Sequence, residues 1–512
     1  GTELKIALFE VQKIARARLE ALVQRRMPVI KPLAMPIDTM LHPADMAGAY
    51  QGRAETKKKR VRPVMTAEQM RDPNYKPGVA RGLLLGIQHV LAMFVVNITP
   101  AILIAGVVGF GFGSENPANM TYMIQMSLFF AGIATLIQAN GIGPVGARLP
   151  IVQGAGFVYL PIMIPIAVQY GMPTLMGAIV ISGVFHFFLG LAIGRIRRWI
   201  PPLVTGLVVL MVGVELIRIG VLYSAGGEQL RGTPEFGSMD QWSLALLVIA
   251  VTLLLKFFAR GVLSESAVLL GLLAGYLFAW WQGIVSLTGL QDSALFVMPN
   301  PLHFGFEFNL SAVVGMCLMA FVSVVATSGN ISVLTQVGAD REASDKELIG
   351  GSTASGLGNV VGGFFGALPG ACFSQSIGLV FLTRLMSRHV VMFSALILIL
   401  CGLMPVIGAG IQTIPVAVLG GALLIMLGMF LAASVNMLAT VSWNKRNMLI
   451  FGIALSVGLG LQFEPDAIQN LPQTARVLMS SGLLPATLIA IVLNLLMPQA
   501  DSDEPSKQMA GS

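Results

Sequence analysis

The amino-acid sequence predicts an all-α polytopic membrane protein with about fourteen transmembrane segments. Of its 512 residues, 55% are hydrophobic and only 11% are charged, and the mean hydropathy is +0.79, whereas a soluble globular chain has roughly 25% charged residues. The apolar residues form runs of about 20, the length that a helix needs to cross the hydrocarbon core of a bilayer. These observations exclude an ordinary soluble enzyme and make the lipid bilayer an obligatory partner.

The segments are expected to begin near residues 82, 121, 150, 173, 200, 243, 263, 311, 353, 374, 389, 414, 446 and 482. With a cytoplasmic N-terminus, every even-numbered segment ends on the cytoplasmic side. The basic loops then all fall on that side, as the positive-inside rule requires: Arg148, Arg195 with Arg197 and Arg198, Lys256 with Arg260, Arg341 with Lys346, Arg384 with Arg388, and Lys445 with Arg446. We therefore expect a multi-pass protein of the cell (inner) membrane with both termini in the cytoplasm.

The N-terminal tail, residues 1–80, holds the whole net charge of the chain. It carries 15 Lys and Arg against 8 Asp and Glu, which gives +7, the formal charge of the full sequence. Beside a membrane domain, such a tail favours the anionic cytoplasmic leaflet over nucleic acid as its partner. Residues 4–26 have apolar side chains near helical spacing, which fits either an interfacial amphipathic helix or a solvated tail. A short cytoplasmic tail is expected at 499–512.

Metal, redox and hydrolytic chemistry find no support in the sequence. Cys317, Cys372 and Cys401 all lie in apolar stretches, so neither a disulfide framework nor a metal cage is predicted. No nucleophile, base and acid can be assembled at a recognisable spacing. We expect neither an enzyme nor a cofactor nor a metal site.

Two interrupted segments, the third and the tenth, indicate where a site lies. Fourteen segments divide into seven plus seven, and transporters built from inverted repeats bind their substrate where corresponding helices are broken. Gln153 follows Pro150 in the first half, and Gln375 follows Pro369 in the second. A broken helix leaves backbone N–H groups without partners, which membrane proteins tolerate only when protein or ligand pairs them.

The side chains at these breaks suit a flat, neutral ligand. The glutamine amides both donate and accept hydrogen bonds, as a heterocycle requires. Phe157 and Phe373 stand beside them and are placed to stack on a ring, although packing against lipid or core is the alternative for each phenylalanine alone.

The stretch from Gln375 to Arg384 resembles the signature of the nucleobase–ascorbate transporter family. The resemblance covers residues from about 80 to 500. Its other matches are Gln88-His89, Gln153-Gly154, Pro201-Pro202 with Val204-Thr205-Gly206, and Asn494-Leu495 with Pro498. The residues around the signature are most similar to those of purine members of the family, the permeases for xanthine or urate.

The resemblance implies a core domain of segments 1–4 and 8–11 (about 81–195 and 310–410) and a gate domain of segments 5–7 and 12–14 (about 198–290 and 412–498). It also implies short strands in the third and tenth segments, a ligand between the third, eighth and tenth segments, and a homodimer. The substrate-binding residues expected from it are Gln153, Gly154, Phe157, Thr327, Ser328, Phe373, Gln375, Ser376 and Gly378.

The sequence departs from the family pattern at the positions that usually carry acids. In the eighth segment the acids are replaced by Ala326 and Asn330, and in the ninth by Ser355; Ser376 replaces the usual asparagine of the signature. Buried carboxylates in membranes are costly and are kept for function, so their loss changes substrate, coupling or transport strength. The groups left for coupling or its support are His89, Asn330, Ser355 and Glu215; Glu215 is three residues from Arg218, a spacing that allows a structural pair.

The expected function is a secondary-active or facilitative permease for nucleobases, most of all purines such as xanthine or urate. Because the usual acids are absent, movement is expected to be uncoupled or coupled to protons through His89. Three alternatives stay open: a permease for uracil or another heterocycle, an anion transporter of the same fold, and a transport-deficient receptor-like homologue. The short tail after the last segment counts against the anion transporter.

Overall fold

The protein is described by a computed structural model that covers residues 66–110, 116–196, 201–285 and 294–497. Internal contacts divide the chain into residues 1–64 and residues 65–512, and the fold below concerns the second unit. The predicted amphipathic helix at 4–26, the basic run at 57–62 and the tail at 499–512 lie outside the described residues.

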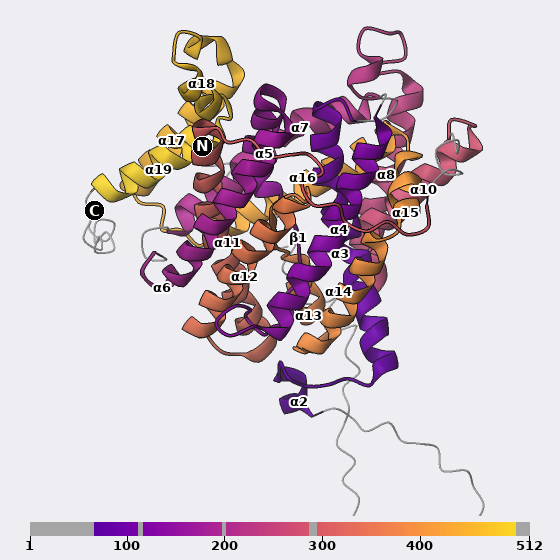
Figure 1. Cartoon of the computed structure of the whole chain (residues 1–512), viewed down its shortest axis with the longest axis vertical. Helices are drawn as coiled ribbons and strands as arrows, with labels where there is room; N and C mark the ends of the chain where they lie inside the picture. The colour runs from indigo at the N-terminus through magenta and orange to yellow at the C-terminus, as the bar shows by residue number, and fades with distance from the viewer. Residues whose placement is uncertain (1–65, 111–115, 197–200, 286–293, 498–512) are drawn as a thin grey trace, which may run out of the picture. The chain divides into compact units, whose positions relative to one another are not determined.

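The described part of the first half is helical apart from one short strand and the connecting loops (Figure 1). Its helices are α2 (Ala67–Arg71), α3 (Val79–Val107), α4 (Pro117–Asn140), α5 (Leu160–Leu191), α6 (Ile193–Ile196), α7 (Pro202–Ser224), α8 (Met239–Phe258), α9 (Val262–Glu265) and α10 (Ala267–Trp281), with single 3₁₀ turns η1 (Phe157–Tyr159) and η3 (Glu228–Leu230). Gly171 has a positive φ of 81° inside α5. This kink divides α5 into two pieces, which correspond to the predicted third and fourth segments.

The second half repeats this order. Its helices are α11 (Leu310–Ala339), α12 (Asp345–Phe364), α13 (Gln375–Thr383), α14 (Arg388–Gly402), α15 (Pro405–Gln412), α16 (Val416–Ala439), α17 (Lys445–Phe463), α18 (Gln473–Ser480) and α19 (Leu483–Leu496), with the 3₁₀ turn η4 (Pro465–Ile468). Helix α12 begins with a capping box, in which Ser344 and Glu347 bond each other's backbone N–H, a signal that the sequence carries at a helix start.

Eight of the described helices are long and apolar enough to cross a membrane, or nine if the bent pair α14 and α15 counts as one span. The all-α membrane fold is therefore confirmed. The exact number of fourteen crossings stays a prediction, because several of the corresponding helices, such as α10 and α19, are shorter than a full span.

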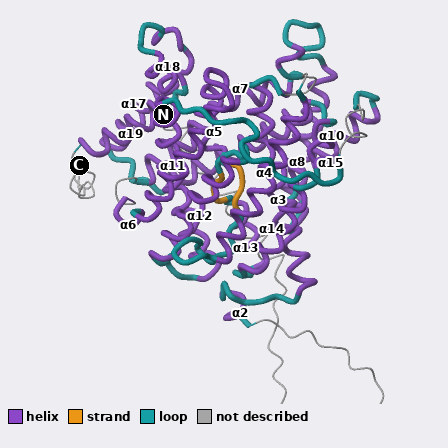
Figure 2. Tube along the Cα trace, viewed as in Figure 1, coloured by secondary structure: helices purple, strands orange, loops and turns teal. Residues whose placement is uncertain are grey.

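Two short strands lie at the predicted breaks and pair with each other. Strand β1 (Gln153–Ala155) is antiparallel to β2 (Gly370–Cys372), and the central pair is Gly154 with Ala371. Figure 2 shows the two strands lying side by side among the helices. The pairing is extended at both ends, because Gly156 N donates to Pro369 O at 2.9 Å and Phe373 N donates to Val152 O at 3.0 Å. Each strand thus satisfies backbone groups of the other, as burial inside a membrane protein demands.

Helix packing follows the two-fold relation between the halves. The second part of α5, the predicted fourth segment, packs on α12, the ninth. Likewise α4, the second segment, packs on α14, the eleventh. Because segments 4 and 11, and segments 2 and 9, correspond in the two halves, the two pairs are equivalent. In the same way, the contact of α8 with α10 in the first half corresponds to the contact of α17 with α19 in the second. Helices α7 and α16 are corresponding helices of the two halves, and they pack on each other. Glycines permit the close approach: a Cβ on Gly356 would collide with the backbone of Phe187, and one on Gly402 would collide with that of Phe129. Small residues at such contacts are typical of membrane helix packing.

Candidate functional site

Polar side chains from neighbouring helices hold both strands at equivalent positions. Asn97 Oδ1, on α3, accepts a hydrogen bond from Ala155 N at 2.8 Å. Asn330 Nδ2, on α11, donates to Cys372 O at 3.0 Å. Ala155 and Cys372 are the third residues of their strands. The first and eighth predicted segments therefore supply one asparagine each to the same strand position.

The first residue of each strand is held in the same way from the next helix. Thr135 Oγ1, on α4, accepts from Gln153 N at 2.9 Å, and Asn359 Oδ1, on α12, accepts from Gly370 N at 2.6 Å. All the side chains that hold the strands at these positions are uncharged. The backbone of both breaks is consequently satisfied without a buried charge, which membrane interiors tolerate poorly.

A cavity of about 180 Å³ lies against β2 and against Gly156, the residue directly after β1. It is smaller than the roughly 300–1,000 Å³ of pockets for drug-sized ligands, so it suits a small molecule. The lining comes from η1, β2 and α11, with Val96 of α3, and from α7 and α16. Among the described residues that line it, none is Lys, Arg, His, Asp or Glu.

Aromatic and sulfur-bearing side chains form much of the cavity wall. Phe157 and Phe430 have ring centroids 5.1 Å apart at an interplanar angle of 38°, and Phe373 lines the same cavity. The Phe373 ring lies so close over Gly154 that a Cβ there would collide with it. Because Gly154 has no side chain, the Phe373 ring can pack directly against the backbone of β1.

Two hydroxyl-bearing residues of α11 line this cavity, and their hydroxyls lack well-formed hydrogen bonds. Ser323 Oγ and Thr327 Oγ1 are buried and make no hydrogen bond of ordinary geometry with a described residue, although the Tyr159 hydroxyl lies near Ser323 and the Cys372 thiol lies near Thr327. The two residues are four apart, which puts them on one face of the helix, and both line the cavity. Buried polar atoms without well-formed hydrogen bonds are rare in native proteins, so these two hydroxyls are candidates to pair with a ligand.

Three of the sequence-predicted substrate residues line the cavity, namely Phe157, Thr327 and Phe373, and so does Asn330. Asn330 had been expected to support coupling, and the structure places it at the cavity while its amide holds β2.

Four other predicted residues support the site without lining it. Gln153 is fully buried, and its Nε2 donates to Ser355 Oγ at 2.9 Å. Ser328 Oγ donates to Val324 O within α11 at 2.9 Å. Ser376 Oγ accepts from Val152 N at 3.3 Å, which ties α13 to the approach to β1.

The signature glutamine and glycine lie on α13. Gln375 is the first residue of that helix, directly after the cavity residue Ser374, and the described part of Gln375 is its backbone. Gly378 lies one turn later, and a Cβ there would come within 3.8 Å of the Glu265 carboxylate. Gln153 and Gln375 are not at equivalent positions, since Gln153 opens β1 and Gln375 follows β2 by three residues.

The titratable candidates lie away from the cavity. His89, on α3, is buried with 4% of its surface exposed, and its Nδ1 has no hydrogen-bond partner among the described residues. Glu215 lines a separate cavity of about 760 Å³ together with Arg218. The pair that their spacing allows is not formed: Glu215 Oε2 is buried without a described partner, whereas the Arg218 side chain is exposed. Exposure keeps the guanidinium hydrated, which offsets the attraction of a partly buried carboxylate.

Sequence reasoning missed a second buried histidine. His186 is fully buried, and its Nδ1 lies 3.2 Å from the Tyr159 hydroxyl. The two residues are 27 positions apart, on either side of the kink at Gly171. No local motif marks such a pair. Asn97, Asn359, Ser323 and Phe430 were missed for the same reason, because only the fold brings them to the strands.

No group of three or more His, Cys, Asp or Glu residues that could hold a metal ion occurs within the described ranges. Cys317, Cys372 and Cys401 are free thiols. The site is therefore built from neutral hydrogen-bonding groups and aromatic rings.

Solved structures support the fold. The structure of the murine Solute Carrier 26 family member A9 anion transporter in the inward-facing state matches with a TM-score of 0.55 at 13% identity, over 82% of this chain and 69% of that chain. A second SLC26A9 structure matches with a TM-score of 0.56 at 11% identity, over 82% and 66% of the two chains. These neighbours have the seven-plus-seven inverted-repeat fold, which confirms that prediction.

Sequence relatives are permeases. The chain is 34% identical to the xanthine permease of Bacillus subtilis over 421 residues, covering 82% of this chain and 94% of the relative. It is 37% identical to the uric acid permease PucK of the same organism, covering 80% and 94%, and 34% identical to the xanthine permease XanP of Escherichia coli, covering 83% and 93%. Residues 81–467 match the sequence profile of the Permease family, Xan_ur_permease. The chain therefore belongs to this family of membrane transporters, the nucleobase–ascorbate transporter family that its signature resembles.

Proposed function

We propose that this chain is a permease for purine bases such as xanthine or urate, and that the 180 Å³ cavity beside β1 and β2 binds the base. The observation that carries the proposal is an uncharged cavity whose lining joins aromatic rings with two residues, Ser323 and Thr327, whose buried hydroxyls lack well-formed hydrogen bonds. Relatives named as xanthine and uric acid permeases, at 34–37% identity, support the choice of substrate.

The chemistry of the cavity matches a flat heterocycle. A purine base presents both N–H donors and carbonyl or ring-nitrogen acceptors, and a hydroxyl can pair with either kind of group. Phe157, Phe373 and Phe430 supply ring faces on which the base stacks. Gln375, Ser376 and Gly378 enter the proposal as the family signature implies, with Gln375 as a direct hydrogen-bond partner of the base.

The alternative of an inorganic anion fits the cavity less well. A buried anion needs a cationic or strongly donating partner to offset its lost hydration, and no described Lys, Arg or His lines this cavity. Uracil presents the same kinds of groups as a purine on one ring, so it stays as a competing substrate that a binding assay must include.

The proposed transport movement places the base between two groups of helices. The cavity is bounded by η1, β2 and α11 from the predicted core and by α7 and α16 from the predicted gate. A shift of the core against the gate would then expose the same site to each side of the membrane in turn, as in other inverted-repeat transporters.

Ion coupling is proposed to be absent or to pass through His89. Ala326 and Asn330 line the cavity and cannot titrate, and Ser355 is occupied by Gln153. His89 is buried with a free Nδ1, and histidine is the side chain whose ordinary pKa, about 6.5, allows proton exchange near neutral pH. Glu215 is the next group to test, because its carboxylate is also buried without a described partner.

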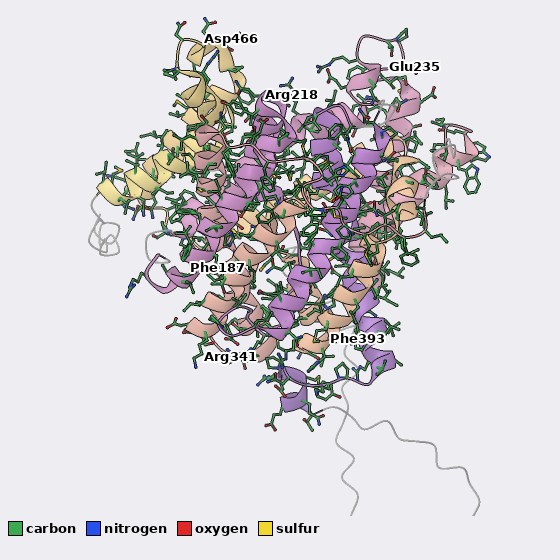
Figure 3. The ribbon with its side chains drawn as sticks, in the orientation of Figure 1. Phe187, Arg218, Glu235, Arg341, Phe393 and Asp466 are labelled. Carbon is green, nitrogen blue, oxygen red and sulfur yellow. The ribbon has the colours of Figure 1, made fainter. Side chains whose placement is uncertain are left out.

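We also propose a homodimer in the cell (inner) membrane with both termini in the cytoplasm. Loops predicted to be cytoplasmic supply Arg148, Arg341 and Arg388 to one cavity. Figure 3 shows Arg341 at the end of the described helices opposite to Glu235 and Asp466, as the positive-inside rule predicts.

Binding to purified protein tests the proposal. Xanthine, urate, uracil and sulfate are titrated against the parent and against Ser323→Ala and Thr327→Val. We expect purine binding, weakened roughly tenfold by each change, since a lost buried hydrogen bond costs about 1–3 kcal/mol. Ser332→Ala is the matched control, because its hydroxyl lies on the same helix outside the cavity lining and donates to Ser328 O. Sulfate binding with no response to any base would overturn the proposal.

A further inference from the structure

A second large cavity, of about 790 Å³, lies at the end of the described helices where Arg341 is found. Four segments that are distant in sequence contribute to it: the stretch after α2, the loop from α4 toward β1, the start of α12 with the loop before it, and the start of α14. The substrate cavity beside the strands shares none of these lining residues.

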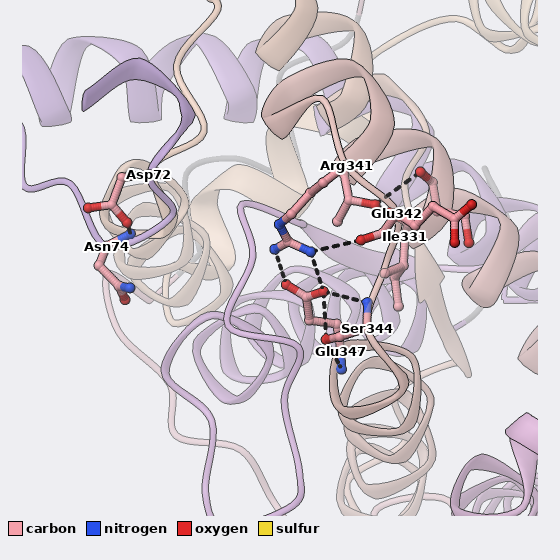
Figure 4. A network of polar contacts seen from close by, with 9 residues as sticks. Asp72, Asn74, Ile331, Arg341, Glu342, Ser344 and Glu347 are labelled. Carbon is pink, nitrogen blue, oxygen red and sulfur yellow. Dashed lines mark hydrogen bonds and ion pairs between the residues drawn. The ribbon is translucent and has the colours of Figure 1, made fainter. Parts of the chain in front are cut away.

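The charge of this cavity is strongly one-sided. Its lining contains four cations, Arg148, Arg341, Lys346 and Arg388, and one carboxylate, Glu347. Glu347 is fully engaged by its neighbours (Figure 4): it pairs with both terminal nitrogens of Arg341, with Nη1 to Oε2 at 2.8 Å, and it accepts from Ser344 Oγ at 2.8 Å. The other three cations are left without a carboxylate partner in the cavity.

Each of these three cations has donors to spare. The side chains of Arg148 and Lys346 make no hydrogen bond or ion pair with a described residue. Arg388 uses Nη1 to cap the end of α4 at Ala139 O and Asn140 O, while its Nε is buried without a described partner. Guanidinium groups bind phosphate oxygens with paired, directed N–H donors.

Nearby acids do not neutralise the cavity. Asp340 pairs with Arg71 at 3.3 Å. Glu342 and Asp345 belong to the same loop region but do not line the cavity. Cations that share a cavity repel one another, and a bound anion removes that repulsion.

From this geometry we propose that the cavity is a binding site for a phosphate-bearing anion, distinct from the substrate site. The ligand bridges Arg148 and Lys346, and Arg388 adds positive charge to the cavity wall. It thereby ties together loops that the N-terminal segment already contacts, since Met386 N donates to Met70 O at 2.8 Å and Arg388 N donates to Pro73 O at 3.0 Å. The phosphate comes either from an anionic lipid headgroup or from a soluble phosphate compound, and the volume accommodates both.

The test follows the melting temperature of the purified full-length protein in detergent while a probe is titrated. One series uses phosphatidylglycerol, with phosphatidylcholine as the uncharged comparison. A second series uses inorganic phosphate and ATP in delipidated protein. A response to phosphatidylglycerol alone assigns the lipid source, and a response to phosphate or ATP alone assigns the soluble source. Both responses should weaken as salt rises, because the attraction is electrostatic.

One variant, Arg148→Gln with Lys346→Gln, neutralises the two free cations. It should raise at least tenfold the probe concentration that gives half of the melting-temperature shift. The charge-keeping variant Lys346→Arg should retain the response of the parent, which separates lost binding from damaged folding. Arg195→Gln is the matched control, because Arg195 is an exposed basic residue that does not line the cavity. No response of the parent to any probe, or an equal response of the neutralised variant, would overturn the proposal.

Discussion

Gln153 Nε2 donates a hydrogen bond to Ser355 Oγ at 2.9 Å, and this bond links the first residue of β1 to the middle of α12. Ser355 Oγ in turn donates to Gly351 O at 3.2 Å. The serine thus occupies the position at which the resembled family often has an acid, and the glutamine amide takes it as its partner. The bond fixes the orientation of the Gln153 amide inside the protein.

The first prediction concerns this pair. Gln153→Ala and Ser355→Ala should each lower the melting temperature, and the double variant should be no worse than the poorer single one. The two changes remove the same buried hydrogen bond, whose coupling we expect to be about 1 kcal/mol. Additive losses in a thermal-unfolding cycle would show that the two residues act separately.

The second prediction concerns the signature residue Gln375. Gln375→Ala should weaken binding of xanthine or urate roughly tenfold or more, since the base loses a buried hydrogen-bond partner. Titration calorimetry on the purified variant checks this, with Gln282→Ala at the end of α10 as the control. Unchanged affinity for every tested nucleobase, at normal levels of folded protein, would place the recognition elsewhere.

The third prediction concerns the close contact at the strand. Gly154→Ala puts a methyl group into the Phe373 ring and against Asn97 Oδ1, so we expect a loss of about 1–3 kcal/mol in stability from overpacking together with weaker base binding. Gly329→Ala is the matched control, because a Cβ there meets nothing within 4 Å. Equal effects of the two substitutions would contradict the packing described here.

The fourth prediction concerns coupling. Uptake of xanthine into proteoliposomes should be either equilibrative or driven by an imposed inward proton gradient in a manner that His89→Asn abolishes. Ala326→Glu returns a carboxylate to the cavity wall and should make uptake proton-stimulated. Strong concentrative uptake that survives His89→Asn would rule out both branches, and Glu215→Gln and His186→Asn would then be the next variants to measure.

The sequence predicted the features that local patterns encode. Proline followed by glutamine located both breaks, and the structure places β1 and β2 there. Phe157 and Phe373, adjacent to the breaks, line the cavity. Residues whose role depends on long-range contact could not be predicted. Asn359 reaches Gly370 from α12, and Phe430 meets Phe157 from a helix more than half the chain away; neither belongs to a motif near a break.

The pairing of β1 with β2 has a consequence for how the protein is made. Strand β1 leaves the ribosome long before β2 is synthesised, because helices α5 to α12 lie between them. Until then, Val152 O and the backbone groups of β1 that pair with β2 lack those hydrogen-bond partners. Unpaired backbone N–H and C=O groups are costly in lipid. The nascent first half must therefore keep this segment beside water or the insertion machinery. A truncated chain that stops before residue 370 is expected to be captured by membrane quality control and degraded.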